Sequence, residues 1–212
     1  MKRSLALKGY DLDQELLDRG MAGAEPTFQI YPYPGRAVVA GRGSNPESEI
    51  FLERCRADEI PVLRRRGGGC AVFLDPGNLI VSAALPAPGI GDIHALFSRC
   101  TQWLLSALNQ MGDCTLDWDG VSDIVLGDKK VGGSCFYRCK GAGYFSASLL
   151  WQPDISAMET YLKYPPRTPD YRRGRAHSQF VTPLYPHLPF GRMFDFTSHL
   201  DAALAKGLDQ LA

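Results

Sequence analysis

The chain has 212 residues, and its 23 Lys and Arg residues balance its 23 Asp and Glu residues. This balance gives no general nucleic-acid or anionic-membrane surface, and no apolar run reaches the roughly 18 residues that a membrane span needs. Because Met1–Lys8 carries cations but no sustained apolar stretch, we predict no signal peptide, a cytoplasmic location and one domain over residues 1–212.

The first half of the chain alternates short apolar runs with turn residues. Asp11 is a predicted helix N-cap, with Gln14 three residues later. The run Leu79–Leu85 is almost continuously apolar, so we expect a strand that is buried on both faces. The predicted elements are a helix at 11–23, strands at 28–31 and 37–40, a charged helix at 47–58, and strands at 60–64, 70–74 and 79–85.

The second half opens with the clearest helix, at 92–111, whose apolar residues recur at helical spacing and which Gly112 follows as a stop signal. Strand-like segments run from 115 to 151, and further helices are predicted at 154–162 and 198–211. Strands and helices do not alternate regularly. We therefore predict an α+β fold with a central mixed or antiparallel sheet flanked by helices.

The cysteines are predicted to be reduced thiols, since a chain without a signal peptide rarely forms disulfides. Cys135 and Cys139 form the only close pair; their spacing is not that of a zinc knuckle, and on a strand they would share a face. We expect buried structural thiols. The six cysteines are at positions 55, 70, 100, 114, 135 and 139.

One stretch joins three cations, Arg64–Arg66, to three glycines, Gly67–Gly69, and then to the apolar run Cys70–Leu74. Glycine permits positive φ and lets the backbone approach a ligand closely. Because a strand follows, the pattern differs from a P-loop, which opens a helix. A glycine-rich hairpin beside a solvated basic patch would explain this stretch equally well.

A second stretch runs from Gly120 to Cys135, where the turn Gly127–Asp128 joins two strand patterns and Lys130 precedes Val-Gly-Gly-Ser. By itself this is a hairpin with an exposed lysine. Together, the ordered patterns R-R-x-x-G-G-x-x-V-x-x-D-x-G-N and D-I-V-x-G-D-K-K-V-x-G-S resemble the superfamily of lipoate–protein ligases, octanoyltransferases and biotin–protein ligases. The segment Val38–Arg42, with Asn45–Pro46 after it, is similar to the lipoate ligase branch.

The resemblance covers residues 36–184 and implies a tunnel for an extended acyl chain, with Lys130 as the catalytic residue and Lys129 pointing away. It implies attachment of lipoate or octanoate, as an amide, to a lysine of an acidic lipoyl carrier domain. ATP would be the second substrate, through an acyl adenylate, and Mg²⁺ the expected cofactor. The implied substrate-binding residues are Arg65, Gly67, Gly68, Gly69, Cys70, Ala71, Val72, Asn78, Asp123, Gly132, Gly133, Ser134 and Ser148.

This assignment agrees with the chemistry. Burying six methylenes stabilises a bound eight-carbon acid by about 5 kcal/mol, at ~0.8 kcal/mol each, and Cys70, Val72 and Leu79 would line the slot. Lys130 and the N–H groups of Gly132–Ser134 would stabilise the phosphate and the reacting carbonyl.

The segment 163–175 contains five cations, one acid and three prolines. A solvated linker has this composition, but its position matches the family's loop over the adenylate, so we expect Arg172, Arg173 and Arg175 to contact phosphate. A basic rim would also attract an acidic carrier domain. We expect His177 to be incidental.

Several residues depart from the family pattern: Ser122 replaces Asn, Cys70 replaces glycine, Leu74 replaces His, and Ser146–Leu150 replaces His-Gly-Thr/Ser-Leu-Leu. A divergent enzyme or an inactive carrier-binding scaffold stays an alternative. The chain ends soon after its last predicted helix, so we expect the family's C-terminal accessory domain to be missing or supplied by a separate protein.

A thioester-dependent transferase usually needs a nucleophilic cysteine, and the segment 163–182 has none. The ATP-dependent ligase is therefore favoured. A biotin ligase is disfavoured because the arginine-rich biotin loop of that branch is missing. No metal-ligating set, nucleic-acid partner or membrane partner is predicted.

Overall fold

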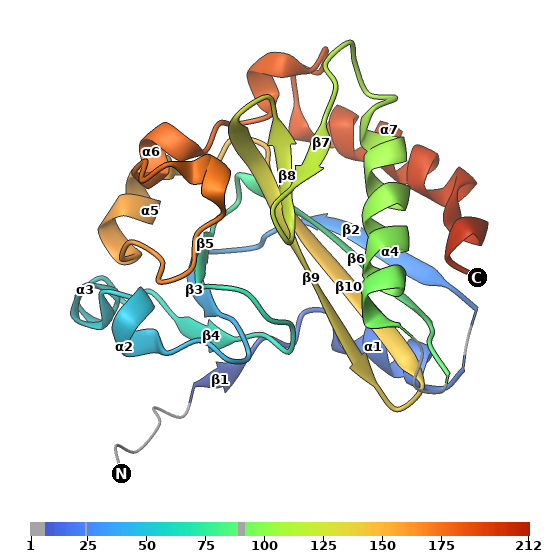
Figure 1. Ribbon diagram of the computed structural model, residues 1–212, viewed down its shortest axis with the longest axis horizontal. Coiled ribbons are helices and arrows are strands. Elements are labelled where there is room, and N and C mark those ends of the chain that lie inside the picture. The colour runs from blue at the N-terminus through green and yellow to red at the C-terminus, as the bar shows by residue number, and fades with distance from the viewer. Residues whose placement is uncertain (1–6, 24, 89–91) are drawn as a thin grey trace.

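The computed structural model describes residues 7–23, 25–88 and 92–212. It contains two adjoining sheets with helices outside them (Figure 1). The described helices are α1 (Gln14–Met21), α2 (Pro46–Glu49), α3 (Leu52–Ala57), α4 (Ile93–Leu108), α5 (Ile155–Tyr161), α6 (His177–Phe180) and α7 (Met193–Lys206). The described strands are β1 (Lys8–Gly9), β2 (Thr27–Pro32), β3 (Ala37–Ala40), β4 (Val62–Arg64), β5 (Val72–Leu74), β6 (Asn78–Pro86), β7 (Asp117–Asp119), β8 (Asp123–Leu126), β9 (Lys129–Cys139) and β10 (Ala142–Leu150).

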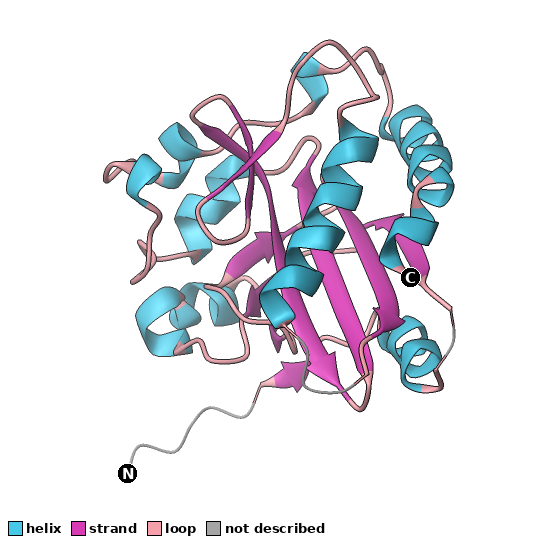
Figure 2. Cartoon of the chain, turned by 45° about the vertical axis from the view of Figure 1, so that its right-hand side comes forward, coloured by secondary structure: helices cyan, strands magenta, loops and turns pink. Residues whose placement is uncertain are grey.

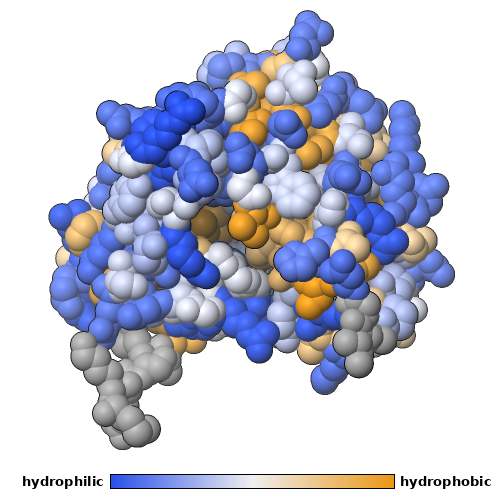
Figure 3. Space-filling model, in the orientation of Figure 1, coloured by the Kyte–Doolittle hydropathy of each residue, from blue (hydrophilic) through white to orange (hydrophobic). Residues whose placement is uncertain are grey.

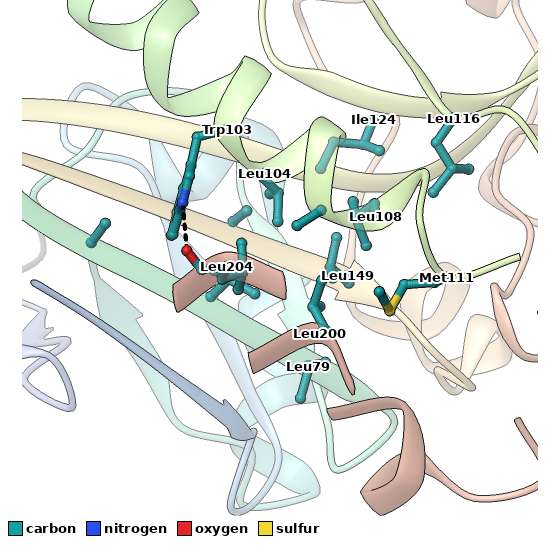
Figure 4. Packing of buried hydrophobic residues seen from close by; sticks show 14 of the residues in the cluster. Leu79, Trp103, Leu104, Leu108, Met111, Leu116, Ile124, Leu149, Leu200 and Leu204 are labelled. Carbon is teal, nitrogen blue, oxygen red and sulfur yellow. Dashed lines mark hydrogen bonds between the residues drawn. The ribbon is translucent and has the colours of Figure 1, made fainter. Parts of the chain in front are cut away.

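The larger sheet has the order β2-β6-β10-β9-β8-β7, and its neighbouring strands are antiparallel. Helix α4 crosses one face of this sheet (Figure 2). Alternate residues of β6, such as Leu79, pack there with Leu104 of α4 and Leu200 of α7 (Figure 4). The Trp103 indole donates from Nε1 to the Leu204 carbonyl at 3.0 Å, which satisfies its polar atom inside this core.

The smaller sheet has the order β1-β4-β3-β5; β1, β4 and β3 are parallel, and β5 runs antiparallel to β3. A second core around Val38, Phe73 and Tyr161 joins this sheet to α5. On the second face of the larger sheet, α1 packs Leu17 against Tyr144 of β10. The rest of that face, towards the smaller sheet, is left for a cavity.

The predicted α+β class and the flanked central sheet are confirmed. The prediction for the first helix is shifted, since α1 begins at Gln14 after Asp13 and not after Asp11. The charged helix predicted at 47–58 is two helices, because Ile50 has extended backbone and forms a bridge with Leu162. In the described part of the chain, no helix is both long and apolar enough to cross a membrane.

Candidate active site

A cavity of about 590 Å³ lies between the larger sheet, the glycine loop and the segment 163–181. Figure 3 shows the molecule hollowed near the centre of this face, with apolar side chains in and beside the hollow. Strands β6, β9 and β10 form one wall, and β5 with the residues before it forms another. A slot between two sheets suits an extended apolar ligand.

The glycine loop is held in shape by hydrogen bonds from the Arg65 side chain. Arg65 donates from its guanidinium to the carbonyls of Val39, Gly68 and Cys70 at 2.6–2.9 Å. Gly69 has φ +90°, which favours glycine. The Arg65 guanidinium therefore hydrogen-bonds to backbone carbonyls of the loop and of β3.

Glu49 holds the next residues of the loop from the opposite side. Its Oε2 accepts from the Ala71 N–H at 2.5 Å and from Ser44 Oγ at 2.8 Å. Glu49 is buried and lines the cavity, so its carboxylate supports the loop from inside the protein.

The floor of the cavity is built from small residues because β9 and β10 run antiparallel with matched alternation. Gly133 pairs with Ser148, and Cys135 pairs with Ser146. A Cβ on Gly133 would lie 3.1 Å from Lys130 Nζ. The missing side chain therefore leaves room for Lys130 to lie over the strand.

Lys130 Nζ lies 2.6 Å from Asp123 Oδ1, and Asp123 Oδ2 accepts from the Tyr171 hydroxyl at 2.8 Å. Asp123 is only 7% exposed. Burial and then the Asp123 charge raise the pKa of Tyr171, so its hydroxyl keeps its proton and stays a donor. Asp123 belongs to β8, Lys130 to β9 and Tyr171 to the segment after α5. The two bonds to Asp123 therefore connect these three parts of the chain.

A β-bulge sets which lysine enters the cavity. The register between β8 and β9 shifts between Ile124 and Val125, so Lys130 lies opposite Val125. Lys129 points elsewhere, and its Nζ donates to the Gln179 carbonyl at 2.6 Å. Lys129 does not line the cavity, which agrees with the orientation predicted for it.

The three arginines predicted over the adenylate occupy different surroundings. Arg172 is 4% exposed, lines the cavity and packs over the rings of Tyr164 and Phe180. Its Nη2 has no hydrogen-bond partner within the described structure. Arg173 is exposed with φ 49°, and Arg175 binds Asp128 through Nη1 at 2.7 Å. Only Arg172 faces the cavity.

His177 also lines the cavity, near the Glu159 carboxylate at 3.9 Å. Burial and then the neighbouring Arg172 charge lower the pKa of His177. The ring is therefore held largely neutral near pH 7.

Behind the cavity lies a cluster centred on Asp13, which is 4% exposed and lines the cavity wall. Its carboxylate accepts from Tyr31 at 2.7 Å, from Ser82 at 3.0 Å and from Tyr144. Gln29 donates to the same carboxylate at 2.5 Å. Burial and then Asp13 raise the pKa values of Tyr31 and Tyr144, so both hydroxyls stay protonated donors.

Most of the residues predicted to bind substrate line this one cavity. Gly67 does not, since a Cβ there would meet Cys135 Sγ at 2.4 Å. The predicted residues that line it are Arg65, Gly68, Gly69, Cys70, Ala71, Val72, Asn78, Asp123, Lys130, Gly132, Gly133, Ser134, Ser148 and Arg172; those that do not are Gly67, Arg173 and Arg175.

Three detailed expectations were wrong. The Ser134 N–H is not a free donor for a ligand, because it donates to the Ser122 carbonyl at 2.8 Å. Leu79 does not line the slot; strand alternation turns it into the core and turns Ile80 towards the cavity. The cysteines also differ from expectation, since Cys55 and Cys100 are buried while the remaining four are partly exposed.

Sequence analysis missed the cavity residues that lie outside the two motifs. Asp13 is the N-cap of α1, where an acidic residue is ordinary, and Glu49 ends the four-residue helix α2 among other charged residues. Tyr171 lies in a segment without periodicity. Only the antiparallel register, which the sequence does not state, places Tyr144 and Ser146 on the cavity face.

Solved structures share this fold. Ta0514 of T. acidophilum, a lipoate protein ligase structure with bound lipoic acid, has a TM-score of 0.72 at 21% identity over 96% of this chain and 81% of that one. A bi-partite lipoate protein ligase and its E2 lipoyl domain from the same organism give 0.74 at 20% over 97% and 84%. A lipoate–protein ligase A bound with ATP gives 0.73 at 22% over 94% and 77%.

This fold, together with the cavity, is that of a catalytic domain of the ligase or transferase class. The family model of the lipoyl protein ligase A/B catalytic domain matches residues 6–205. The chain belongs to that family. The resemblance to the lipoate ligase branch is thereby confirmed.

Proposed function

We propose that this protein attaches lipoate or octanoate to a specific lysine of an acidic lipoyl carrier domain through an acyl adenylate. Membership of the family supports ligase or transferase chemistry in general. Relatives of the same fold were solved with lipoic acid, with ATP and with an E2 lipoyl domain, which supports these three classes of partner.

The position of Lys130 is the observation that carries the proposal. Its ammonium lies over Gly133, at the cavity wall that faces the glycine loop. Asp123 takes one of its three donors at 2.6 Å, which leaves two for oxygen atoms of a bound ligand. A preorganised cation in a partly desolvated site stabilises the negative charge that develops on a carbonyl or phosphate.

Arg172 is the second donor that we assign to the phosphate. Its guanidinium is held between Tyr164 and Phe180 and by a 2.9 Å bond from Nε to the Arg175 carbonyl, while Nη2 is unpaired. A buried, unpaired guanidinium N–H is costly unless a ligand accepts from it. Mg²⁺ would enter with the nucleotide, since it prefers phosphate oxygens and one or two carboxylates, and Asp123 is the carboxylate beside Lys130.

A thioester-dependent transferase is the alternative. Such an enzyme would need a reactive cysteine in the cavity, and Cys70 and Cys135 are the candidates. Although Cys135 as a residue is partly exposed, its sulfur packs against Gly67. The resulting desolvation raises the pKa of Cys135, with Arg65 opposing the shift only in part, so its nucleophilic thiolate is disfavoured. We predict that Cys70→Ser and Cys135→Ser each keep acyl transfer within about tenfold of the wild type. An acyl-thioester adduct detected by mass spectrometry, and lost in one of these variants, would favour the transferase.

The direct test is ATP–pyrophosphate exchange with lipoate, octanoate and no acid, measured on the purified chain. We expect exchange that depends on the acid, followed by transfer to an isolated lipoyl domain after the chain is supplemented with any accessory protein. Exchange without acid dependence, or none with either acid while transfer from an acyl thioester proceeds, would overturn the adenylate. Binding of a lipoyl domain with neither reaction would favour the inactive scaffold.

A further inference from the structure

Asp123 is shared between two donors that belong to different parts of the chain. Oδ1 faces Lys130 of β9, and Oδ2 accepts from Tyr171, which lies in a 3₁₀ turn at Asp170–Arg172. Tyr171 thereby connects the segment 163–176 to the Lys130–Asp123 pair by a side-chain hydrogen bond. The Asp123 side chain is only 10% exposed, so water does not replace the tyrosine freely.

The segment that carries Tyr171 is fastened along the β8–β9 hairpin. Arg175 donates to the Asp128 carboxylate at 2.7 Å and to its carbonyl at 2.8 Å. Further along, the Thr182 N–H donates to the Lys130 carbonyl at 2.9 Å. A Cβ on Gly120 would lie 3.1 Å from Pro169, so the turn before β8 also touches this segment. These contacts keep Tyr171 in register with Asp123.

We propose that Tyr171 is a positioning residue for Lys130, acting through the Asp123 carboxylate. This inference rests on the proposed function of Lys130. With the Tyr171 hydroxyl on Oδ2, the carboxylate presents Oδ1 to the ammonium. The orientation of the carboxylate fixes where the other two lysine donors point.

Removing the Tyr171 hydroxyl leaves Lys130 as the remaining one of these two donors to Asp123. The freed Oδ2 lacks its donor, and the carboxylate turns to offer both oxygens to Lys130. The ammonium is then drawn towards Asp123 and away from the ligand oxygens. The acyl slot is unchanged, because Tyr171 does not line the cavity and the slot is built from β5, β6, β9 and β10. Adenylate formation should suffer while acid binding does not.

The test uses Tyr171→Phe in the full chain, with the first-turnover rate of adenylate formation and the affinity for octanoate measured separately. A hydrogen bond to a charged group is worth about ten- to hundredfold in rate. We expect the first-turnover rate of adenylate formation to fall about ten- to hundredfold, with the octanoate Kd within twofold of the wild type. A loss confined to Kd, or no loss at all, would overturn the proposal.

Two comparisons separate positioning from the general effect of losing a tyrosine–aspartate hydrogen bond. Tyr161→Phe is the matched control, since the Tyr161 hydroxyl also donates to an aspartate, Asp58 at 2.9 Å, and Tyr161 does not line the cavity. It should leave the first-turnover rate unchanged. In an Asp123→Ala background, Tyr171→Phe should add less than twofold, because both variants then remove the same interaction. Fully additive losses would contradict action through Asp123.

A measurement without turnover keeps the inference distinct from the proposed function. Trypsin cleaves after exposed arginines such as Arg173, so the rate of cleavage reports how firmly the segment is held. Tyr171→Phe and Asp123→Ala should raise this rate several-fold and equally, and Tyr161→Phe should not. If the wild type activates neither acid, the proposed function fails. If all four proteins are cleaved at the same rate, the Tyr171–Asp123 bond does not hold the segment, and this inference fails.

Discussion

Two adjacent lysines provide the sharpest comparison at the scale of single residues. Lys130→Ala should lower acyl transfer by roughly 10²–10³, the usual loss for one preorganised donor. Lys129→Ala should be mild, because its Nζ only donates to the Gln179 carbonyl. Single-turnover transfer to a lipoyl domain, with the Tm of each variant measured alongside, checks this.

Lys130→Arg extends the same comparison. The planar guanidinium is larger and aims its charge differently from an ammonium, and Gly133 leaves space sized for the lysine. We expect poor rescue. Equal losses from Lys129→Ala and Lys130→Ala would overturn the assignment of the site.

At the scale of elements, the segment 163–176 separates two kinds of arginine. Arg172→Ala should weaken nucleotide affinity about tenfold or more, since it removes a buried donor. Arg173→Ala should leave nucleotide affinity unchanged and raise the KM for an acidic lipoyl domain, because its exposed charge acts only by long-range attraction. Added salt should shrink the second effect and not the first. Nucleotide binding by calorimetry and KM at two ionic strengths are the measurements.

Helix α6 should make stability depend on pH through His177. The lowered pKa means that, between the folded value and the unfolded value near 6.5, the unfolded chain binds more protons than the folded one. Stability contributed by the neutral ring is therefore present above about 6.5 and is lost as pH falls below it. Chemical denaturation at pH 7.5 and 5.5 should show a smaller loss for His177→Gln than for the wild type. Identical pH dependence would contradict this.

The sequence alone predicted the elements and the two motifs well, for a physical reason. Strand β3 appears over the predicted residues because Val and Ala recur where both faces are buried. The family resemblance singled out Lys130, and Lys130 lines the cavity, whereas the β-bulge that sets its position in the sheet is not visible in the sequence. What failed were features set by distant contacts, such as the bond from Ser134 to Ser122 and the break of the charged helix at Ile50.

At the scale of the whole molecule, the site depends on two sheets that meet. The glycine loop belongs to the smaller sheet, and Lys130 and the floor belong to the larger one. Neither sheet alone encloses the cavity. Because their relative placement comes from pairings between residues far apart in the chain, periodicity within one segment does not predict it.

The Asp13 cluster has a consequence for which acids the protein accepts. Ser148 pairs with Gly133, beneath Lys130, and lies four residues along β10 from Tyr144, or about 13 Å. An extended eight-carbon acid spans about 9 Å, from seven zigzag C–C bonds of ~1.5 Å. A much longer tail would have to displace hydroxyl donors from a buried carboxylate.

The Asp13 cluster therefore limits the length of the acyl chain that the cavity accepts. Affinity should rise by about 0.8 kcal/mol for each methylene from hexanoate to octanoate and should stop rising, or fall, by dodecanoate. Calorimetry across the even-numbered acids measures this without any turnover. Ser146→Ala, which removes the partner of Ser82 at the edge of the cluster, should move the limit towards longer acids. A dodecanoate affinity that continues the same increment would show that the slot is open at this end, and the choice of acyl length would then lie with whatever supplies the acid.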